Sequence, residues 1–70
     1  MISYKPLWKT MEKRNITSYT LINKYNISKN TIYRLKHNEG MSTTLLNDLC
    51  RILNCRVEDI LLYVPDDSNL

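Results

Sequence analysis

Apolar residues recur at helical spacing in five stretches of the chain, and polar residues separate these stretches. Leu21, Ile22 and Tyr25 fall on one face of a helix, and Ile32 and Leu35 repeat the pattern in the next stretch. No stretch shows the strict alternation that a half-buried strand requires. The pattern therefore predicts an all-α fold, a compact bundle of five helices at residues 6–13, 18–25, 29–36, 43–53 and 56–62.

Residues that cap or stop helices stand at most of these boundaries. Pro6 suits the first turn of a helix, where its missing N–H costs nothing. Asn26 and Asn54 tolerate the left-handed backbone conformation, so we expect them to end the second and fourth helices. The loop 37–40 contains Gly40, the only glycine, which is free to adopt a positive φ. The N-cap candidates are Thr17 or Ser18, then Ser28, then Ser42 or Thr43.

Residues 17–35 form a unit of two short helices joined by a tight turn. Asn26 stops the first helix, and Ser28 follows where its hydroxyl can accept a backbone N–H of the next turn. This arrangement is the sequence form of a helix-turn-helix, whose second helix enters the major groove of DNA. Residues 29–36 are thus the candidate recognition helix.

The chain resembles the Cro and lambda-repressor type of helix-turn-helix domain (XRE-like), in particular small stand-alone regulators of bacteria and phages. Two positions depart from the family pattern: Asn26 replaces the usual turn glycine, and Ile22 stands where a small alanine is common. The resemblance implies a lambda-repressor-like DNA-binding domain at residues 1–65 and a polar tail at residues 66–70. It covers about Tyr4 to Pro65 and is carried by Tyr4-Lys5-Pro6-Leu7-Trp8-Lys9, Ile27-Ser28-x-x-Thr31-Ile32, Leu46-x-x-Leu49-Cys50-x-x-Leu53 and Val57-Glu58-Asp59-Ile60-Leu61.

The net charge of +3 is distributed unevenly along the chain. Residues 1–37 carry eight basic side chains and one acidic side chain, whereas residues 38–70 carry two basic and six acidic ones. A basic half that contains the helix-turn-helix suits a protein with one face on a polyanion. A charge split alone is weak evidence, because solvated faces are often lopsided. Its coincidence with the motif strengthens the interpretation that the partner is double-stranded DNA.

Four side chains of the candidate recognition helix are predicted to read base edges. Arginine and lysine can donate to guanine O6 and N7, asparagine can bond bidentately to adenine, and tyrosine can contact a thymine methyl or reach a phosphate. The resemblance implies the same positions, because repressors of this type place base-contacting side chains there. The alternative for the cations is an ordinary solvated helix face. With Ile32 and Leu35 toward the core, the outward candidates are Lys29, Asn30, Tyr33 and Arg34.

Contacts to the DNA backbone are expected at helix N-termini and around the end of the recognition helix. Free N–H groups and the helix dipole attract phosphates, and such contacts set register without reading sequence. Several of the candidates are also possible N-caps, and the two roles are compatible. The candidates are Thr17, Ser18, Tyr19, Lys36, His37, Asn38, Ser42 and Thr43.

The C-terminal half carries more apolar side chains than one small core can take. The surplus is predicted to form a patch that a second copy covers, which gives a homodimer. A two-fold partner placed there sets the two recognition helices about 34 Å apart, in successive major grooves. The alternative is that these side chains close the bottom of the monomer's own core. The predicted interface residues are Val57, Leu61, Leu62 and Tyr63.

No constellation of residues predicts catalysis, a metal site or a cofactor. Cys50 and Cys55, with one distant His37, do not supply the four ligands that zinc usually takes, so we interpret the cysteines as reduced core residues. His37 lacks a paired nucleophile and acid, and Trp8 is interpreted as packing. A single glycine leaves no glycine-rich phosphate loop. We therefore expect no enzyme and no small-molecule ligand.

The sequence further predicts a soluble cytoplasmic protein without a membrane partner. No apolar run approaches about 18 residues, and the N-terminus lacks the features of a signal peptide. Abundant Asn, Ile, Lys and Tyr are typical of an AT-rich bacterium or its phage.

Two functions from different classes follow from these features. The first is a sequence-specific transcriptional regulator, a repressor that binds an inverted-repeat operator as a homodimer. The second is a protein-interaction module, such as an antirepressor, an antitoxin-like protein or an inhibitor subunit, that retains the fold. Lys29, Asn30 and Arg34 favour DNA, because a protein-binding surface would more often display aromatic and aliphatic anchors.

Overall fold

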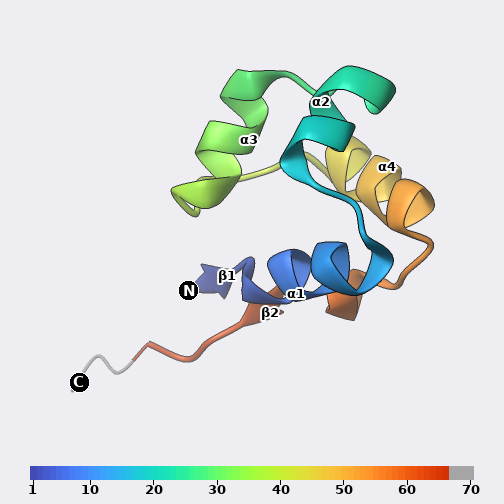
Figure 1. Ribbon diagram of the computed structural model, residues 1–70. Helices are drawn as coiled ribbons and strands as arrows, with labels where there is room; N and C mark the ends of the chain where they lie inside the picture. Colours follow the sequence, from blue (N-terminus) through green and yellow to red (C-terminus); the bar gives the residue numbers. More distant parts are fainter. Residues whose placement is uncertain (67–70) are drawn as a thin grey trace.

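Four helices and a short two-stranded sheet make up the fold of residues 1–66, the part of the chain that this computed structural model describes (Figure 1). The two strands lie together near the N-terminus, and α2 and α3 lie at the other side of the molecule (Figure 1). The expected tail at 66–70 lies outside the described residues except for Asp66. The elements are β1 (Ile2–Ser3), α1 (Lys5–Arg14), α2 (Ser18–Tyr25), α3 (Lys29–Lys36), α4 (Thr43–Leu53), a 3₁₀ turn (Val57–Asp59) and β2 (Leu62–Tyr63).

The core is formed by the inner faces of the four helices, together with Tyr4 before α1, Ile27 between α2 and α3, and Ile60 after the 3₁₀ turn. Burying these apolar side chains is the main favourable term in folding, because their surface leaves water. Ile22, at the position where alanine is common in the family, is half-buried and packs against the margin of the core. The buried apolar residues are Tyr4, Leu7, Met11, Leu21, Ile27, Ile32, Leu35, Leu49, Leu53 and Ile60.

The predicted helix boundaries are largely confirmed. The hydroxyls of Thr17, Ser28 and Ser42 cap α2, α3 and α4, each accepting a backbone N–H three residues on at 3.0–3.1 Å. Asn26 and Asn54 end α2 and α4 in the left-handed conformation, with φ of 59° and 50°. Short polar side chains thus set these boundaries locally, as capping physics requires.

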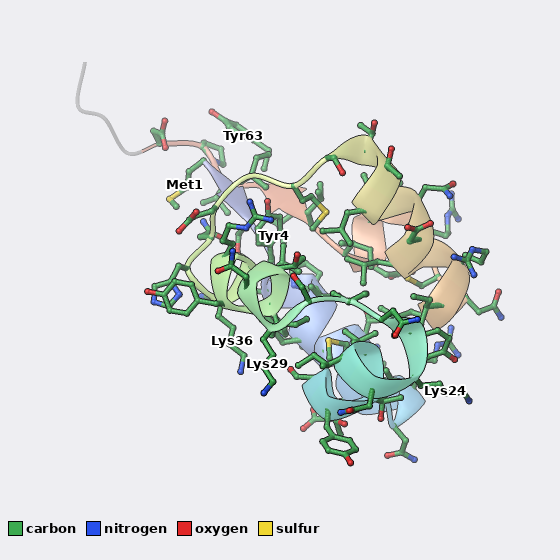
Figure 2. All side chains as sticks on the ribbon, turned by 90° about the horizontal axis from the view of Figure 1, so that it is seen from above. Met1, Tyr4, Lys24, Lys29, Lys36 and Tyr63 are labelled. Carbon is green, nitrogen blue, oxygen red and sulfur yellow. The ribbon has the colours of Figure 1, made fainter. Side chains whose placement is uncertain are left out.

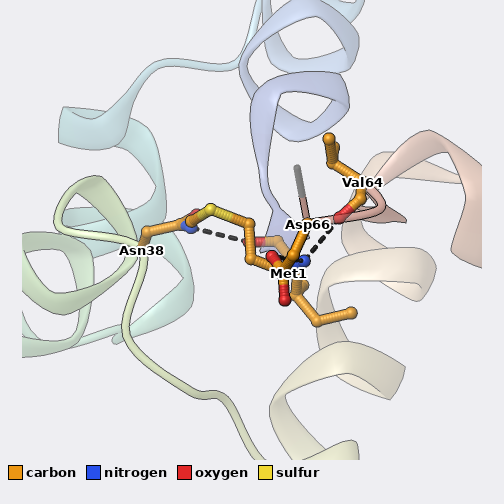
Figure 3. Close-up of polar contacts among 5 residues, drawn as sticks. Met1, Asn38, Val64 and Asp66 are labelled. Carbon is orange, nitrogen blue, oxygen red and sulfur yellow. Dashed lines mark hydrogen bonds and ion pairs between the residues drawn. The ribbon is translucent and has the colours of Figure 1, made fainter. Parts of the chain in front are cut away.

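The loop after α3 differs from the expectation. Gly40 does not have a positive φ, and Asn38 adopts the left-handed conformation with φ of 61°. The Asn38 N–H donates to the Leu35 carbonyl, which completes a left-handed helix stop. The Asn38 side-chain amide also donates to the Ile2 carbonyl at 2.6 Å (Figure 3). This bond ties the end of α3 to β1 and accounts for an asparagine at a position that usually favours glycine.

The predicted fifth helix at residues 56–62 is wrong. Only Val57–Asp59 is helical, as a single 3₁₀ turn, and Leu62–Tyr63 forms β2 instead. Strand β2 pairs antiparallel with β1, so that Ile2 lies opposite Tyr63 and Ser3 lies opposite Leu62. Within residues 1–66 the fold is therefore mostly helical, with four helices and one small two-stranded sheet in place of the expected five helices.

Carbonyls at the end of the 3₁₀ turn accept hydrogen bonds from α1. The Ile60 carbonyl accepts the Leu7 N–H at 3.1 Å, and the Asp59 carbonyl accepts the hydroxyl of buried Thr10 at 2.7 Å. These bonds hold the end of the 3₁₀ turn against α1. Leu62 and Tyr63 then pair with β1, and this pairing takes the place of a further helical turn.

The first residue closes the sheet. The Met1 ammonium donates to the Val64 carbonyl and pairs with the Asp66 carboxylate at 3.0 Å (Figure 3). The Val64 N–H in turn donates to the Met1 carbonyl at 2.8 Å. Each strand has only two residues, so these flanking bonds extend the pairing beyond the strands themselves.

Candidate nucleic-acid interface

Helix α3 is held firmly at both ends. Ser28 caps its N-terminus, and the Asn38 and Glu39 N–H groups bond to carbonyls of its last turns at 3.1 and 2.9 Å. Its inner face is anchored by Ile32 and Leu35, which are both buried. The outward side chains therefore project from a fixed backbone, which a surface that reads hydrogen-bond patterns requires.

The outward face of α3 carries all four predicted base-reading residues. Lys29, Asn30, Tyr33 and Arg34 are all exposed. With 3.6 residues per turn, Asn30 lies opposite the side that Ile32 and Leu35 bury, and Tyr33 and Arg34 lie on its two flanks. Lys29 and Lys36, seven residues apart, point to the same side of α3 (Figure 2).

The cations of α2 and α3 carry unneutralised charge. Within residues 1–66, none of Lys24, Lys29, Arg34 and Lys36 forms an ion pair. In the second half of the chain, Arg51 pairs with Asp48 at 3.4 Å and Arg56 pairs with Glu58 at 3.5 Å. The charge asymmetry of the sequence therefore persists at this surface, where it favours a polyanion.

Arg34 borders a groove between α3 and the start of α4. The groove has a volume of about 510 Å³ and is lined by Ser28 and Thr31 on one wall and by Gly40 and Ser42 on the other. The structure thus brings the N-cap of α4 next to α3. Two predicted contact residues that are eight positions apart in sequence, Arg34 and Ser42, share this surface.

The N-terminus of α2 supplies a second group of predicted contacts. The Thr17 hydroxyl is engaged as the cap, and Ser18 is half-buried. Tyr19 is 74% exposed in the first turn, so its phenol group is accessible to a partner. The structure therefore assigns Thr17 a capping role and leaves Tyr19 as the accessible side chain.

The remaining predicted backbone contacts are arranged differently. Lys36 and His37 are exposed, but the Asn38 side chain is engaged with β1. Thr43 lines a separate groove of about 360 Å³ with Cys50, Cys55 and other residues, and this groove is distinct from the one that holds Ser42. Thr43 is thus not brought together with Arg34.

The predicted dimer residues divide into two groups. Val57, Leu62 and Tyr63 are 46%, 41% and 62% exposed, whereas Leu61 is half-buried and packs against the core. Met1 and Tyr63 lie at the opposite side of the molecule from Lys24 and Lys29 (Figure 2). Lys24 and Lys29 are therefore remote from the exposed sheet, whereas Lys36 lines a hollow together with Met1 and Val64.

The two cysteines are free and half-buried. Burial, followed by the neighbouring Cys50, raises the pKa of the Cys55 thiol above its ordinary value, so the thiol stays protonated at neutral pH. No three His, Cys, Asp or Glu side chains within residues 1–66 are close enough together to hold a metal ion. None of the described helices combines the length and apolar character that a bilayer crossing needs.

One feature of this surface was missed in the sequence. The ring of His37 stacks on the ring of Tyr33 with a centroid distance of 3.9 Å. Two ring-bearing residues four positions apart are neighbours on a helix, so their spacing was a usable signal.

Comparisons with known proteins agree with this geometry. The family model of the Cro/C1-type helix-turn-helix DNA-binding domain matches residues 6–66. The crystal structure of the transcriptional regulator VanUg (form II) is similar with a TM-score of 0.82 and 35% sequence identity, over 93% of this chain and 87% of that one. A comparison with curated proteins gives no match. The chain belongs to the family of Cro/C1-type helix-turn-helix DNA-binding domains.

Proposed function

We propose that this protein is a transcriptional regulator that binds a specific double-stranded DNA sequence with α3 in the major groove. The observation that carries the proposal is the outward face of α3, where four exposed polar or cationic side chains project from a helix that is capped and anchored. Family membership supports it, as does the similarity to a transcriptional regulator.

The side chains of α3 have distinct proposed roles. Asn30 bonds to an adenine edge, and Lys29 and Arg34 donate to guanine O6 and N7. Tyr33 is the fourth base-reading residue. Residues near the N-terminus of a recognition helix reach deepest toward the bases, which supports Lys29 and Asn30 for this role.

Phosphates are proposed to bind on either side of α3. On one side lie Tyr19 and the free N–H groups of the first turn of α2, with Thr17 and Ser18 contributing through the main chain. On the other side lie Ser42 and the groove that it shares with Arg34. Lys36, His37, Asn38 and Thr43 complete the predicted set; Asn38 contributes chiefly by fixing the loop, because its side chain is engaged.

The proposed active form is a homodimer on an inverted repeat. Its interface centres on Val57, Leu62 and Tyr63, whose exposure supports a surface that a second copy covers, while Leu61 supports them from the core. Sedimentation should show a dimer of the wild type, weakened in Tyr63→Asp and retained in Tyr19→Asp, which changes an exposed tyrosine on α2. A wild type that is monomeric at micromolar concentration, free and on palindromic DNA, contradicts the dimer.

Repression by occupancy is the proposed mode of action: bound protein covers a promoter and excludes polymerase. A reporter gene behind the selected binding site should lose expression when the protein is present, and Arg34→Ala should restore expression. An increase in expression with the wild type contradicts repression and indicates an activator.

A protein-interaction module remains the second candidate function, and the exposed apolar side chains of the sheet favour it. Ile2 and Tyr63 are 43% and 62% exposed, so these apolar side chains are not taken up by the protein's own core. This surface lies away from Lys24 and Lys29 (Figure 2), so protein contact and DNA binding are compatible.

Selection from a random DNA pool, followed by a binding assay over a range of salt concentrations, tests the proposed function. We expect enrichment of one sequence and a slope of log K against log salt of about −0.9 per phosphate neutralised. No enrichment together with a flat salt response contradicts DNA recognition and supports the protein-interaction candidate.

A further inference from the structure

Tyr33 and His37 form a stacked pair on the exposed side of α3. Their ring centroids are 3.9 Å apart, and the ring planes meet at 26°. Both residues are exposed, with Tyr33 at 56%. The two rings are thus in close stacking contact on the exposed side of the helix.

His37 is anchored both by its backbone N–H and by its ring. His37 is the C-cap of α3, and its backbone N–H donates to the carbonyls of Tyr33 and Arg34. Its ring Nδ1 lies 2.8 Å from the Tyr33 carbonyl. A carbonyl only accepts, so Nδ1 carries the hydrogen and the neutral ring leaves Nε2 free. The imidazole is thus anchored to the helix end and covers one face of the Tyr33 ring.

This anchoring restricts Tyr33 before any partner binds. A free tyrosine side chain must lose rotamer freedom on binding, and a ring that is already held avoids most of that loss. His37 also lies seven residues after Asn30, which places both on the side of α3 farthest from the core. The ring pair consequently faces the same partner as Asn30.

The uncovered part of the Tyr33 ring is an apolar surface among polar neighbours. Lys36 projects from the same helix and supplies positive charge for a phosphate (Figure 2). In the major groove, the C5-methyl of thymine is the apolar group that a base edge presents. The ring matches this group better than it matches a phosphate that Lys36 can already reach.

We propose that Tyr33 contacts a thymine C5-methyl and that His37 is a positioning residue that holds the Tyr33 ring for this contact. The inference rests on the proposed function, since it requires α3 in the major groove. It assigns a thymine contact to Tyr33 and a positioning role to His37, which lies just beyond the end of α3.

Replacement of single thymines by deoxyuridine in the selected site removes only the methyl group and tests the contact. At one position, wild-type affinity should fall about fourfold, the value of one buried methyl group. Tyr33→Ala should abolish this dependence and Tyr33→Phe should keep it, because the ring and not the hydroxyl makes the contact. If wild-type affinity is unchanged by deoxyuridine at every position and Tyr33→Phe binds more weakly, the proposal is overturned in favour of a phosphate contact.

His37 is tested in the same assay. His37→Ala should lose most of the discrimination between thymine and deoxyuridine, whereas His37→Phe, which keeps a ring over Tyr33, should restore it. Equal discrimination by wild type and His37→Ala overturns the positioning role. Binding of each variant to non-specific DNA at low salt is the folding control. If the wild type binds a specific sequence without dependence on any thymine methyl, the inference alone is refuted. If the wild type shows no specific binding at all, the proposed function is refuted as well.

The free protein provides a test that needs no DNA. Protons of the His37 ring should show an upfield NMR shift from the Tyr33 ring current, and Tyr33→Leu should remove it. His37 shifts that are identical in the two proteins contradict the stacked pair.

Discussion

The outward face of α3 and the β1–β2 sheet are both exposed, but they are held in place by different means. On α3, exposed Asn30 and Arg34 project from a helix that buried Ile32 and Leu35 anchor, and local caps fix both its ends. The sheet exposes Tyr63 on a strand of two residues, and its position depends on bonds to the other end of the chain.

This difference separates two kinds of recognition. A fixed polar face suits hydrogen bonds to base edges, whose geometry tolerates little displacement. Burial of an apolar surface is favourable roughly in proportion to the area buried and imposes no bond direction. Such a surface therefore suits contact with another protein. In the proposed function, the rigid side binds DNA and the apolar side binds a second copy or another protein.

The largest expected effect on stability comes from the anchors of α3. Ile32→Ala should lower the free energy of unfolding by about 2–5 kcal/mol, because it leaves a cavity in the core. The matched change in the sheet, Leu62→Ala, should cost less than about 1 kcal/mol, since Leu62 is already 41% exposed. Denaturant unfolding of both variants measures the difference. Equal losses contradict the distinction between the two regions.

A smaller effect is expected at the cap of α3. Ser28→Ala removes the oxygen that accepts the Thr31 N–H at 3.0 Å and should cost about 1 kcal/mol. Ser28→Thr keeps an oxygen at this position and should retain most of the stability. Thermal unfolding compares the melting temperatures of the two variants and the wild type. If all three are equal, the cap has no role in stability.

The helix-turn-helix was predictable because its determinants are local. Ser28 and Asn26 act on backbone groups within a few residues, and Ile32 and Leu35 repeat at helical spacing. The exposed positions of α3 follow directly from the buried ones. The groove between Arg34 and Ser42 was not predictable, because it depends on how the start of α4 lies against α3.

The region after α4 was not predictable from local pattern. Val57 and Leu61 have helix-like spacing, yet the next residue, Leu62, pairs with Ser3, which lies far away in the sequence. Strands of two residues are too short to show alternation. Asn38 was missed for the same reason, since the bond that accounts for its left-handed conformation ends on Ile2.

The smallest expected effect lies in the loop that joins α3 to α4. Gly40 has no positive φ, and a Cβ built there meets nothing within 4 Å. Gly40→Ala should therefore raise the free energy of unfolding by about 0.4–1 kcal/mol, by restricting the unfolded chain. A thermal melt measures the change. A clear loss of stability would mean that the loop needs the freedom of glycine after all.

The most direct test of DNA recognition by α3 is the affinity of matched variants for the selected site. Asn30→Ala and Arg34→Ala should each cost about 1–3 kcal/mol and relax the preference at one base position. Asn47→Ala and Arg51→Ala replace the same residue types on exposed positions of α4 and should leave affinity and preference unchanged. If the α4 variants lose specific binding while the α3 variants keep it at matched salt, α3 is not the recognition helix.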